Sequence, residues 1–240
     1  SVSDPSEVLK TEGNLNNHIG VPLTLLRLRP GHRYVVVEMG MSARGEIAYL
    51  ASLARPDVGV ITAIGPAHIE TLGSLSNIAA AKGELFTGLP DGATAVYPVG
   101  HEHQLLHEQA VFAGTEGGRL RAATVELRAK NSDPTPGVMV SAHLVSMGED
   151  GLVMDFRFPS LSADAPGGNA VTVELPLLGA HNTTNAALAA AAALSLDIPP
   201  SVIVTGLGRA LAGKHRGQHV VVAGRHVLDD CYNANPISTV

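Results

Sequence analysis

The sequence has few residues of the kinds that form aromatic, disulfide or strongly cationic features. Its 240 residues contain no tryptophan, one cysteine and only 3% aromatic residues, so stacking platforms for bases or sugars are scarce. The single cysteine, Cys231, cannot form an internal disulfide, which favours a reducing compartment, and we expect a cytoplasmic protein. The net charge of −6 offers no attraction to nucleic acid or anionic membranes, and we expect neither as a partner.

Long apolar runs are also absent. No uninterrupted stretch approaches the roughly 20 residues that a membrane span needs. Hydrophobic residues nevertheless make up 45% of the chain, which excludes disorder and predicts a buried core. The chain begins at Ser1 without an initiator methionine or a signal-like segment, and it stops just after a polar cluster. We therefore expect it to be a piece of a larger protein.

Short apolar runs alternate with helical patterns in the first half of the chain. The pairs are 34–37 with EIAYLASLA, 58–62 with SNIAAAKGELF, and 93–97 with EHQLLHEQAV. This alternation predicts an α/β fold with a mostly parallel sheet flanked by helices. Ligands of such sheets bind beyond the carboxyl ends of the strands, where Glu38 and His68 are expected.

The pattern changes from about residue 119 to residue 177. Short strands separated by turn-rich segments predict an antiparallel region built of hairpins. HNTTNAALAAAAALSL then predicts an alanine-rich helix, VIVTGLGRAL predicts a further helix, and QHVVVAGRHVLDD predicts a hairpin.

The segment 208–218 nearly matches a phosphate-binding loop. From Gly208 it reads G-x-x-x-x-G-K-H, and His215 stands where a Ser or Thr hydroxyl would hold Mg²⁺. The predicted helix also precedes Gly213 and a strand follows, the reverse of the order that directs backbone N–H groups at a phosphate. We therefore expect that this segment is not a phosphate loop.

Three residues of the first half have unusual surroundings. Glu38 follows three valines that we expect to be buried, where a carboxylate needs a cation or a hydrogen-bond donor unless it turns to water. His68 follows the next strand of the same sheet and is either a surface residue or a ligand beside Glu38. Lys82, one of four lysines, is either a surface lysine or a partly buried amine with a lowered pKa. A neutral amine can take up CO₂ and become a carbamate, which resembles a carboxylate ligand.

Amide side chains cluster twice along the chain. Asn14, Asn16 and Asn17 lie in TEGNLNN, and Asn182 and Asn185 lie in GAHNTTN. Capping of a helix would by itself account for Asn182. Two such clusters nevertheless favour recognition of a polar ligand.

Several long segments together resemble the Mur ligase family, and within it the branch that adds D-alanyl-D-alanine. The resemblance covers nearly the whole chain in the family's order and is carried by TEGNLNNHIGVPLTLLRL, VVVEMGMSARGEIAYL, RPDVGVITAIGPAHIETLGSLSNIAAAKGELF, LLGAHNTTNAALAAAA and LDDCYNANP. It implies a central ATP-binding domain at 1–228, related to P-loop NTPases but without the phosphate loop, and the start of a C-terminal domain at 229–240.

The resemblance also implies an activity for the full-length protein, a monomer. That enzyme would use ATP to join D-Ala-D-Ala to UDP-MurNAc-tripeptide through an acyl phosphate in peptidoglycan precursor synthesis. The fragment by itself is expected to be inactive. Matching positions imply two Mg²⁺ ions held by Glu38, His68 and a carbamylated Lys82, of which His68 and Lys82 also act in catalysis.

Further roles are implied on the nucleotide and substrate sides. Asn182 and Asn185 match the amides near adenine, and Asp230 matches the acidic residue that holds the ribose. Arg216 matches the arginine that reaches the phosphates and acts in catalysis. The substrate side is assigned to Asn14 and Asn17.

Two other functions remain open from the sequence. The first is a sister amide ligase of the same superfamily, such as a folylpolyglutamate type, against which the ending DDCYNANP speaks. The second is a nucleotide-binding module without catalytic activity. The joint presence of Glu38, His68, Lys82 and Asp230 argues against this second function.

Overall fold

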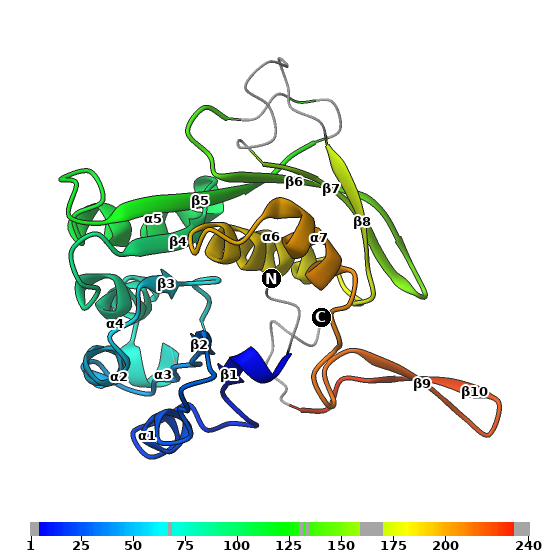
Figure 1. Ribbon diagram of the computed structural model, residues 1–240, viewed down its shortest axis with the longest axis horizontal. Coiled ribbons are helices and arrows are strands. Elements are labelled where there is room, and N and C mark those ends of the chain that lie inside the picture. Colours follow the sequence, from blue (N-terminus) through cyan, green and yellow to red (C-terminus); the bar gives the residue numbers. More distant parts are fainter. Residues whose placement is uncertain (1–4, 67–68, 130–131, 133–134, 159–169, 233–240) are drawn as a thin grey trace. The chain divides into compact units, whose positions relative to one another are not determined.

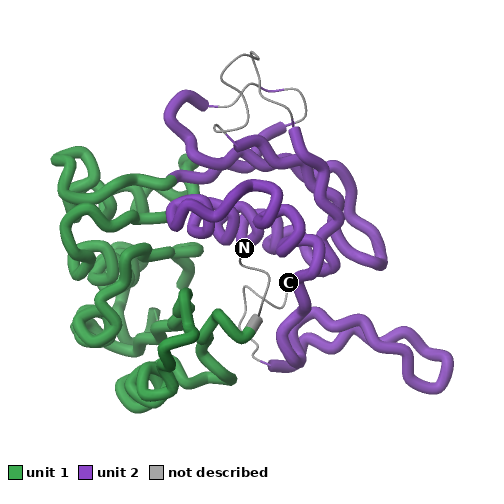
Figure 2. Tube along the Cα trace, in the orientation of Figure 1, with its two compact units in different colours: residues 1–123 green, residues 124–240 purple. Residues whose placement is uncertain are grey.

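The chain forms two compact units that both contain helices and strands. The structure, a computed structural model, describes residues 5–66, 69–129, 132, 135–158 and 170–232. Residues 1–123 make up the first unit and residues 124–240 the second (Figure 2). Within the described residues, no helix has the length and apolar composition needed to cross a membrane. The domain limits inferred from the sequence, 1–228 and 229–240, stay predictions.

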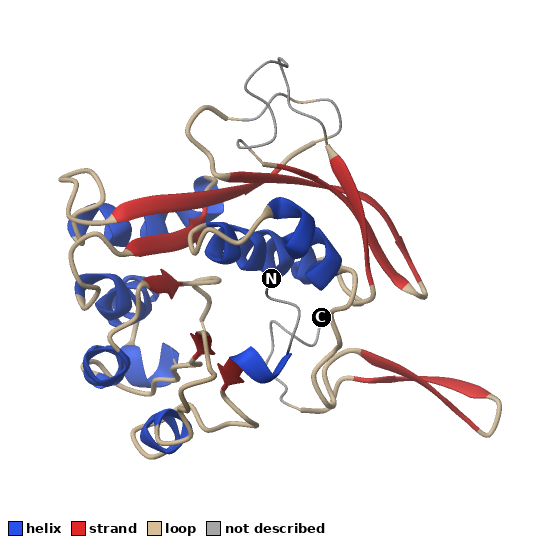
Figure 3. Ribbon diagram, viewed as in Figure 1, coloured by secondary structure: helices blue, strands red, loops and turns tan. Residues whose placement is uncertain are grey.

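The elements of the first unit alternate between strands and helices (Figures 1 and 3). In chain order they are the 3₁₀ helix η1 (Pro5–Glu7), β1 (Val8–Lys10), α1 (Gly20–Leu25), β2 (Tyr34–Val36), α2 (Glu46–Ala54), β3 (Val58–Val60), α3 (Ile69–Leu72), α4 (Leu75–Thr87), β4 (Thr94–Pro98), the 3₁₀ helix η2 (His101–His103), α5 (Gln104–Phe112) and the beginning of β5 (Arg121–Leu127).

The second unit has a run of strands followed by two helices and a hairpin (Figures 1 and 3). After the rest of β5 come β6 (Val140–Gly148), β7 (Gly151–Arg157), β8 (Val171–Leu175), α6 (His181–Leu194), α7 (Pro200–Leu207), β9 (Gln218–Val222) and β10 (Arg225–Asp229). The two predicted helices and the predicted terminal hairpin of this half are confirmed.

The strand predicted at 34–37 belongs to a small separate sheet. β2 pairs in parallel with β1 alone, whereas β3 pairs with β4 in another sheet. The prediction that Glu38 follows buried valines in the same sheet as the strand at 58–62 is therefore wrong. Val35 is 39% exposed and Val36 is 60% exposed. Within the described residues β1 is the one strand paired with β2, so the other edge of β2 has no neighbouring strand.

The core of the first unit surrounds β4, whose residues are all buried. β4 pairs in parallel with β3, and the start of β5 extends the sheet, since the Arg121 N–H donates to the Ala93 carbonyl oxygen at 2.8 Å. Phe86 of α4 and Leu106 of α5 are fully buried beside Tyr97. Parallel strands packed against helices confirm the predicted α/β arrangement.

Glu84 on α4 holds the beginning of α2. Its carboxylate oxygens accept hydrogen bonds from the Gly45 N–H at 2.8 and 3.0 Å, and one of them also accepts from the Ala48 N–H at 3.2 Å. Amides in the first turn of a helix have no partner within the helix, and the positive end of the helix dipole favours a carboxylate. One side chain thus caps a neighbouring helix.

We expect Glu84→Ala to lower the free energy of unfolding by about 1–2 kcal/mol, because the amides at the start of α2 lose their acceptor. Glu84→Gln should lower it less, because the amide oxygen still accepts a hydrogen bond. Glu70→Ala, at an exposed position of α3, is the control. Urea unfolding followed by circular dichroism gives the midpoints, and equal midpoints for the two alanine variants would contradict the capping role.

The sheet of the second unit is mixed. β6, β7 and β8 pair antiparallel in sequence, which confirms the predicted hairpins for this part. β5 and β6, in contrast, pair in parallel, so the expectation of a hairpin between them is wrong. The connection 128–139 is about as long as a parallel crossover requires and much longer than a tight turn, which permits the strand to return in the same direction.

The alanine-rich helix α6 packs on β6 and β7. Alternate residues of β7, namely Leu152, Met154 and Phe156, are buried, as expected for a strand with one covered face. Ala187 and Ala190 of α6 are also fully buried. The small side chains let the helix backbone approach the sheet closely.

A buried carboxylate lies in β5. Glu126 is 9% exposed, and its Oε1 accepts hydrogen bonds from the Ser141 hydroxyl at 2.7 Å and the Thr135 N–H at 3.0 Å. Burial by itself raises the pKa of this carboxyl, but the hydrogen bonds from Thr135 and Ser141 and the charge of Arg128 outweigh it. The pKa of Glu126 is therefore lowered, and the group is ionised at neutral pH.

The ionisation of Glu126 makes stability depend on pH. The pKa of Glu126 is lower in the folded than in the unfolded protein, so its ionisation adds to the free energy of unfolding. This stabilisation is fully present above the pKa of the unfolded protein and is lost as the pH falls through the pKa of the folded protein. We expect Glu126→Gln to cost about 1 kcal/mol at neutral pH and to flatten the loss of stability below about pH 5. Urea midpoints at several pH values test this; parallel pH curves for wild type and variant would contradict it.

Candidate functional site

Glu38 lies two residues beyond the carboxyl end of β2, where the side chains of Thr11 and Asn16 hold it. The Glu38 N–H donates to the Thr11 hydroxyl oxygen at 2.9 Å, and Asn16 Nδ2 donates to Glu38 Oε1 at 2.8 Å. The Thr11 N–H in turn donates to the Val36 carbonyl oxygen at 3.0 Å. The parallel pair of strands thus brings the TEGNLNN segment and Glu38 together. Sequence reasoning named Asn16 within that segment but missed its contact with Glu38.

Gly40 leaves room for the Asn16 side chain. The Gly40 N–H donates to the Asn16 carbonyl oxygen at 2.8 Å, and a Cβ on Gly40 would lie 3.0 Å from the Asn16 side chain. Asn17 points elsewhere, since its Oδ1 accepts from the Ile19 and Gly20 N–H groups at the start of α1. Asn14 is exposed, and the substrate roles of Asn14 and Asn17 stay predictions.

Lys82 lies in α4 with its amine partly withdrawn from water. Its Nζ donates to the Ala63 carbonyl oxygen, in the segment after β3, at 2.8 Å. Burial lowers the pKa of Lys82, because loss of solvent disfavours the charged form. The half-buried side chain and its lowered pKa support the predicted partly buried amine, and the role of Lys82 in a site stays a prediction.

These residues fit a Mg²⁺ site in part. Mg²⁺ takes oxygen ligands, and the exposed carboxylate of Glu38, oriented by Asn16, is one. An amine is a poor ligand for Mg²⁺, so Lys82 fits only as a carbamate, whose formation requires the neutral amine that a lowered pKa favours. His68 lies outside the described residues, and its place in the site stays a prediction.

In the second unit, Asn182 and Asn185 contact each other on the first turn of α6. Asn185 Nδ2 donates to Asn182 Oδ1 at 3.1 Å, and Asn182 Nδ2 donates to the Leu178 carbonyl oxygen at 2.7 Å. A capping side chain would instead accept a hydrogen bond from a backbone N–H. The alternative that Asn182 serves only as a helix cap is therefore wrong.

Arg216 and Asp230 belong to one local network at the base of the β9–β10 hairpin. Asp230 Oδ1 accepts from the Gly217 N–H at 3.0 Å, and the Arg216 guanidinium lies 4.1 Å from the centroid of the Tyr232 ring. Cation–π contact of this kind holds a guanidinium in place. The structure thus brings these two predicted nucleotide residues together through their immediate neighbours.

The asparagine pair and this network share a neighbour. A Cβ on Gly217 would lie 4.0 Å from the Leu178 carbonyl oxygen, the same oxygen that accepts from Asn182 Nδ2. Two adjoining segments of the second unit therefore carry the residues predicted to bind the adenine and those predicted to bind the phosphates.

The segment ending in Gly213-Lys214-His215 lies after α7 and before β9. This confirms the predicted helix–strand order, which cannot direct backbone N–H groups at a phosphate as a phosphate loop does.

His215 has a left-handed backbone, with φ of 60°. Its imidazole Nδ1 contacts Asp229 Oδ2 at 2.7 Å, and Cys231 Sγ donates to Asp229 Oδ1 at 3.1 Å. The hydrogen bond from His215 lowers the pKa of Asp229, and the one to Asp229 raises the pKa of Cys231.

Comparison with known sequences identifies the family. The profile of the Mur ligase middle domain matches residues 2–193. The chain belongs to the Mur ligase middle-domain family. The matched range contains Glu38, Lys82 and the Asn182–Asn185 pair, whereas the β9–β10 hairpin lies beyond it. The family inferred from the sequence segments is confirmed.

Full-length relatives of this Mur ligase domain are known ligases. The UDP-N-acetylmuramoyl-tripeptide–D-alanyl-D-alanine ligase of Escherichia coli K12 is 37% identical over 98% of this chain, which covers 48% of that protein. The corresponding ligase of Bacillus subtilis 168 is 35% identical over 96% of the chain and 45% of the protein. The chain thus spans about half the length of the curated relatives it matches.

Solved Mur ligase structures share the fold. MurF from Acinetobacter baumannii superposes with a TM-score of 0.81 at 31% identity, over 97% of this chain and 46% of that one. This agreement confirms the predicted α/β class, a mostly parallel sheet with flanking helices and an antiparallel part.

Proposed function

We propose that this chain is the ATP-binding middle domain of a cytoplasmic, monomeric ligase that joins D-alanyl-D-alanine to a UDP-N-acetylmuramoyl-tripeptide. The observation that carries the proposal is the 37% identity to the Escherichia coli ligase of that name over 98% of the chain. The half-buried Lys82 amine in the first unit and the joined Arg216 and Asp230 segments in the second each agree with it. Residues 1–240 alone are proposed to be inactive, because they span about half of such a ligase.

The second unit is proposed to hold the nucleotide. The Asn182–Asn185 pair presents amides to the adenine, and Asp230 accepts hydrogen bonds from the ribose hydroxyls. Arg216, held by the Tyr232 ring, places a permanent positive charge at the phosphates, where a guanidinium binds oxyanions through paired N–H groups.

The reaction proposed for the intact enzyme is acyl activation by ATP. An oxygen of the tripeptide's terminal carboxylate attacks the γ-phosphorus, and the bond to the ADP oxygen breaks. The amine nitrogen of D-Ala-D-Ala then attacks the acyl carbon, loses a proton, and inorganic phosphate leaves. Positive charge around the transferring phosphoryl group is the main requirement of the first step, and Arg216 contributes to it.

The first unit is proposed to hold two Mg²⁺ ions through Glu38, His68 and a carbamylated Lys82. These ions, when bound, neutralise the charge of the phosphates. Lys82 would form the carbamate when its neutral amine nitrogen adds to the carbon of CO₂ and releases one proton. Asn16 keeps the Glu38 carboxylate oriented.

Substrate profiling of the full-length protein tests the proposal. With ATP, UDP-MurNAc-tripeptide and D-Ala-D-Ala we expect phosphate release that needs all three, and a product whose mass includes the dipeptide. ATP-dependent addition of glutamate to a folate instead would identify the folylpolyglutamate type. Nucleotide binding without any product would favour a non-catalytic module. Product formation by residues 1–240 alone would overturn the proposed inactivity of the fragment.

A further inference from the structure

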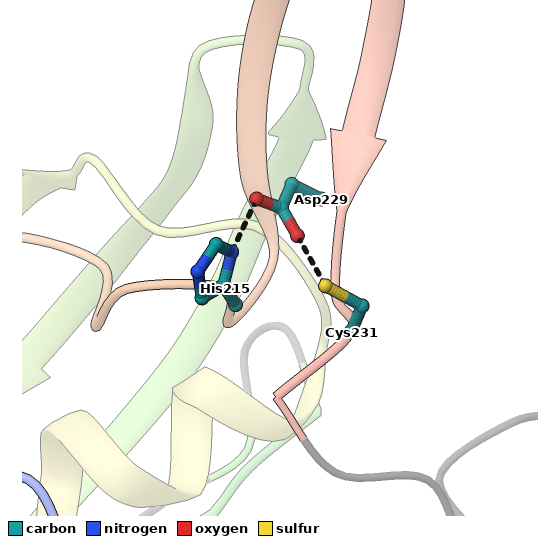
Figure 4. A group of neighbouring side chains, drawn as sticks. All are labelled: His215, Asp229 and Cys231. Atoms are coloured by element: carbon teal, nitrogen blue, oxygen red, sulfur yellow. Dashed lines mark hydrogen bonds and ion pairs between the residues drawn. The ribbon is translucent and has the colours of Figure 1, made fainter.

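Three potential metal ligands converge where the β9–β10 hairpin meets the rest of the second unit (Figure 4). His215 precedes β9, Asp229 is the last residue of β10, and Cys231 follows it by two positions. One ligand atom from each, an imidazole nitrogen, a carboxylate oxygen and the thiol sulfur, all lie within 4.8 Å of one another. None of the three has a role in the ligase reaction proposed above.

The order of contacts excludes a nucleophilic triad. In such a triad the histidine lies between the thiol and the carboxylate, so that it can remove the thiol proton. Here Asp229 lies in the middle: one oxygen contacts His215 Nδ1 at 2.7 Å and the other accepts from Cys231 Sγ at 3.1 Å. Both neighbours instead contact a single carboxylate, so that the three potential ligand atoms lie close together.

We propose that His215, Asp229 and Cys231 bind one first-row transition metal ion, with Zn²⁺ as the preferred ion. Imidazole nitrogen, thiolate sulfur and carboxylate oxygen are the ligands that Zn²⁺ takes, and three protein ligands leave a fourth tetrahedral position for water. The thiolate disfavours Mg²⁺ and Ca²⁺, which take oxygen ligands. Binding replaces the thiol proton by the metal, and the proton goes to solvent.

The backbone holds the three ligands near one another without a metal. The Tyr232 N–H donates to the His215 carbonyl oxygen at 3.0 Å, and the His215 N–H donates to Gln218 Oε1 at 3.1 Å. Gln218 in turn stands opposite Asp229 in the β9–β10 register. Because both chain segments are already tied together, the ion needs only small side-chain movements to reach bonding distances.

The ion would also stabilise a neighbouring network. Arg216 and Asp230 each lie next to a proposed ligand in the sequence, and the Gly217 N–H joins the two segments through Asp230. Metal binding at 215, 229 and 231 would therefore fix the segments that carry Arg216 and Asp230. The metal site itself does not depend on the proposed ligase function, since it can be measured without nucleotide.

Cobalt substitution tests the site, because Co²⁺ takes the ligands of Zn²⁺ and its bond to a thiolate absorbs light. Cys231 is the only cysteine of residues 1–240, so in this chain any thiolate–cobalt charge-transfer band reports on this position. We expect the band to saturate at one Co²⁺ per chain and to disappear when Zn²⁺ is added. It should be absent in Cys231→Ser, and Co²⁺ should bind about tenfold or more weakly to His215→Gln and to Asp229→Asn.

The same hairpin supplies a matched control. His219 Nε2 and His226 Nδ1 lie 2.8 Å apart on the facing strands, outside the proposed ligand set. His226→Gln should leave the thiolate band unchanged. Absence of the band in the wild type, an unchanged band in His215→Gln, or one Co²⁺ per two chains would overturn the proposal.

A chemical readout keeps the test independent of variants that fail to fold. Cys231 is exposed, so iodoacetamide should alkylate it in the metal-free protein. Saturating Zn²⁺ should slow alkylation about tenfold or more, because the metal-bound thiolate is a weaker nucleophile, and a chelator should restore the rate. Equal rates with and without Zn²⁺ in the folded wild type would contradict the site, whatever the ligase assay gives.

Discussion

Lys82→Ala is expected to reduce the ligase activity of the full-length protein by about a hundredfold or more, and added short-chain carboxylates should restore part of it. The reason is the partly buried amine of Lys82, whose pKa is lowered by burial. A neutral amine can become a carbamate, and a free carboxylate that enters the vacated space replaces the carbamate oxygens. Steady-state rates with and without acetate or propionate measure the effect.

Lys82→Arg is the matched control for this prediction. It keeps a positive charge at the position but cannot form the carbamate, so its activity should be as low as that of Lys82→Ala. A carbamate signal in the ¹³C NMR spectrum after addition of ¹³C-bicarbonate should appear in wild type and in neither variant. Full activity of Lys82→Arg would show that charge alone is required and would contradict the carbamate.

Arg119→Met is expected to lower the free energy of unfolding by about 3 kcal/mol, the largest stability effect among the substitutions considered. The Arg119 guanidinium donates to the carbonyl oxygens of Leu89 at 2.7 Å, Phe86 at 3.2 Å and Ala113 at 2.8 Å. These carbonyls lie at and beyond the carboxyl ends of α4 and α5, where helices run out of N–H partners for their last carbonyls. The Phe86 carbonyl oxygen also accepts a hydrogen bond from the Leu89 N–H at 3.2 Å. Methionine fills similar space but donates no hydrogen bond, so the acceptors lose their donor.

Arg121→Met provides the comparison, since Arg121 is exposed and its Nε makes one hydrogen bond, to the Gly92 carbonyl oxygen at 3.1 Å. We expect it to change the free energy of unfolding by less than about 1 kcal/mol. Urea unfolding at constant m-value gives both numbers. Equal destabilisation by the two substitutions would mean that the carbonyl contacts of Arg119 contribute little.

Local patterns in the sequence predicted the local structure well. EIAYLASLA forms α2 with the same limits, Glu46–Ala54, and the terminal hairpin forms at the predicted place. Helical periodicity and turn residues depend on positions a few residues apart, so they can be predicted from a single sequence. The alanine neighbours of Lys82 left open whether its amine is partly buried or on the surface, and the contact with the Ala63 carbonyl oxygen came only from the structure.

Contacts between distant segments could not be predicted in this way. Asn16 reaches Glu38, Glu84 caps α2, and Arg119 binds the ends of two helices. Each contact depends on strand register and on how helices pack, which no short segment specifies. The burial of β2 and the direction of β6 relative to β5 were predicted wrongly for this reason, since both depend on which strands become neighbours.

By itself, the sequence determined the family, the α/β class and the positions of most helices and strands, because these follow from long matching segments and local periodicity. Only the tertiary structure decided which side chains meet. It placed Asn16 on Glu38, joined Asn182 to Asn185, and brought His215, Asp229 and Cys231 to one point. The physical reason is that such contacts form when packing closes loops between distant residues, and that packing reflects the whole fold rather than any one segment.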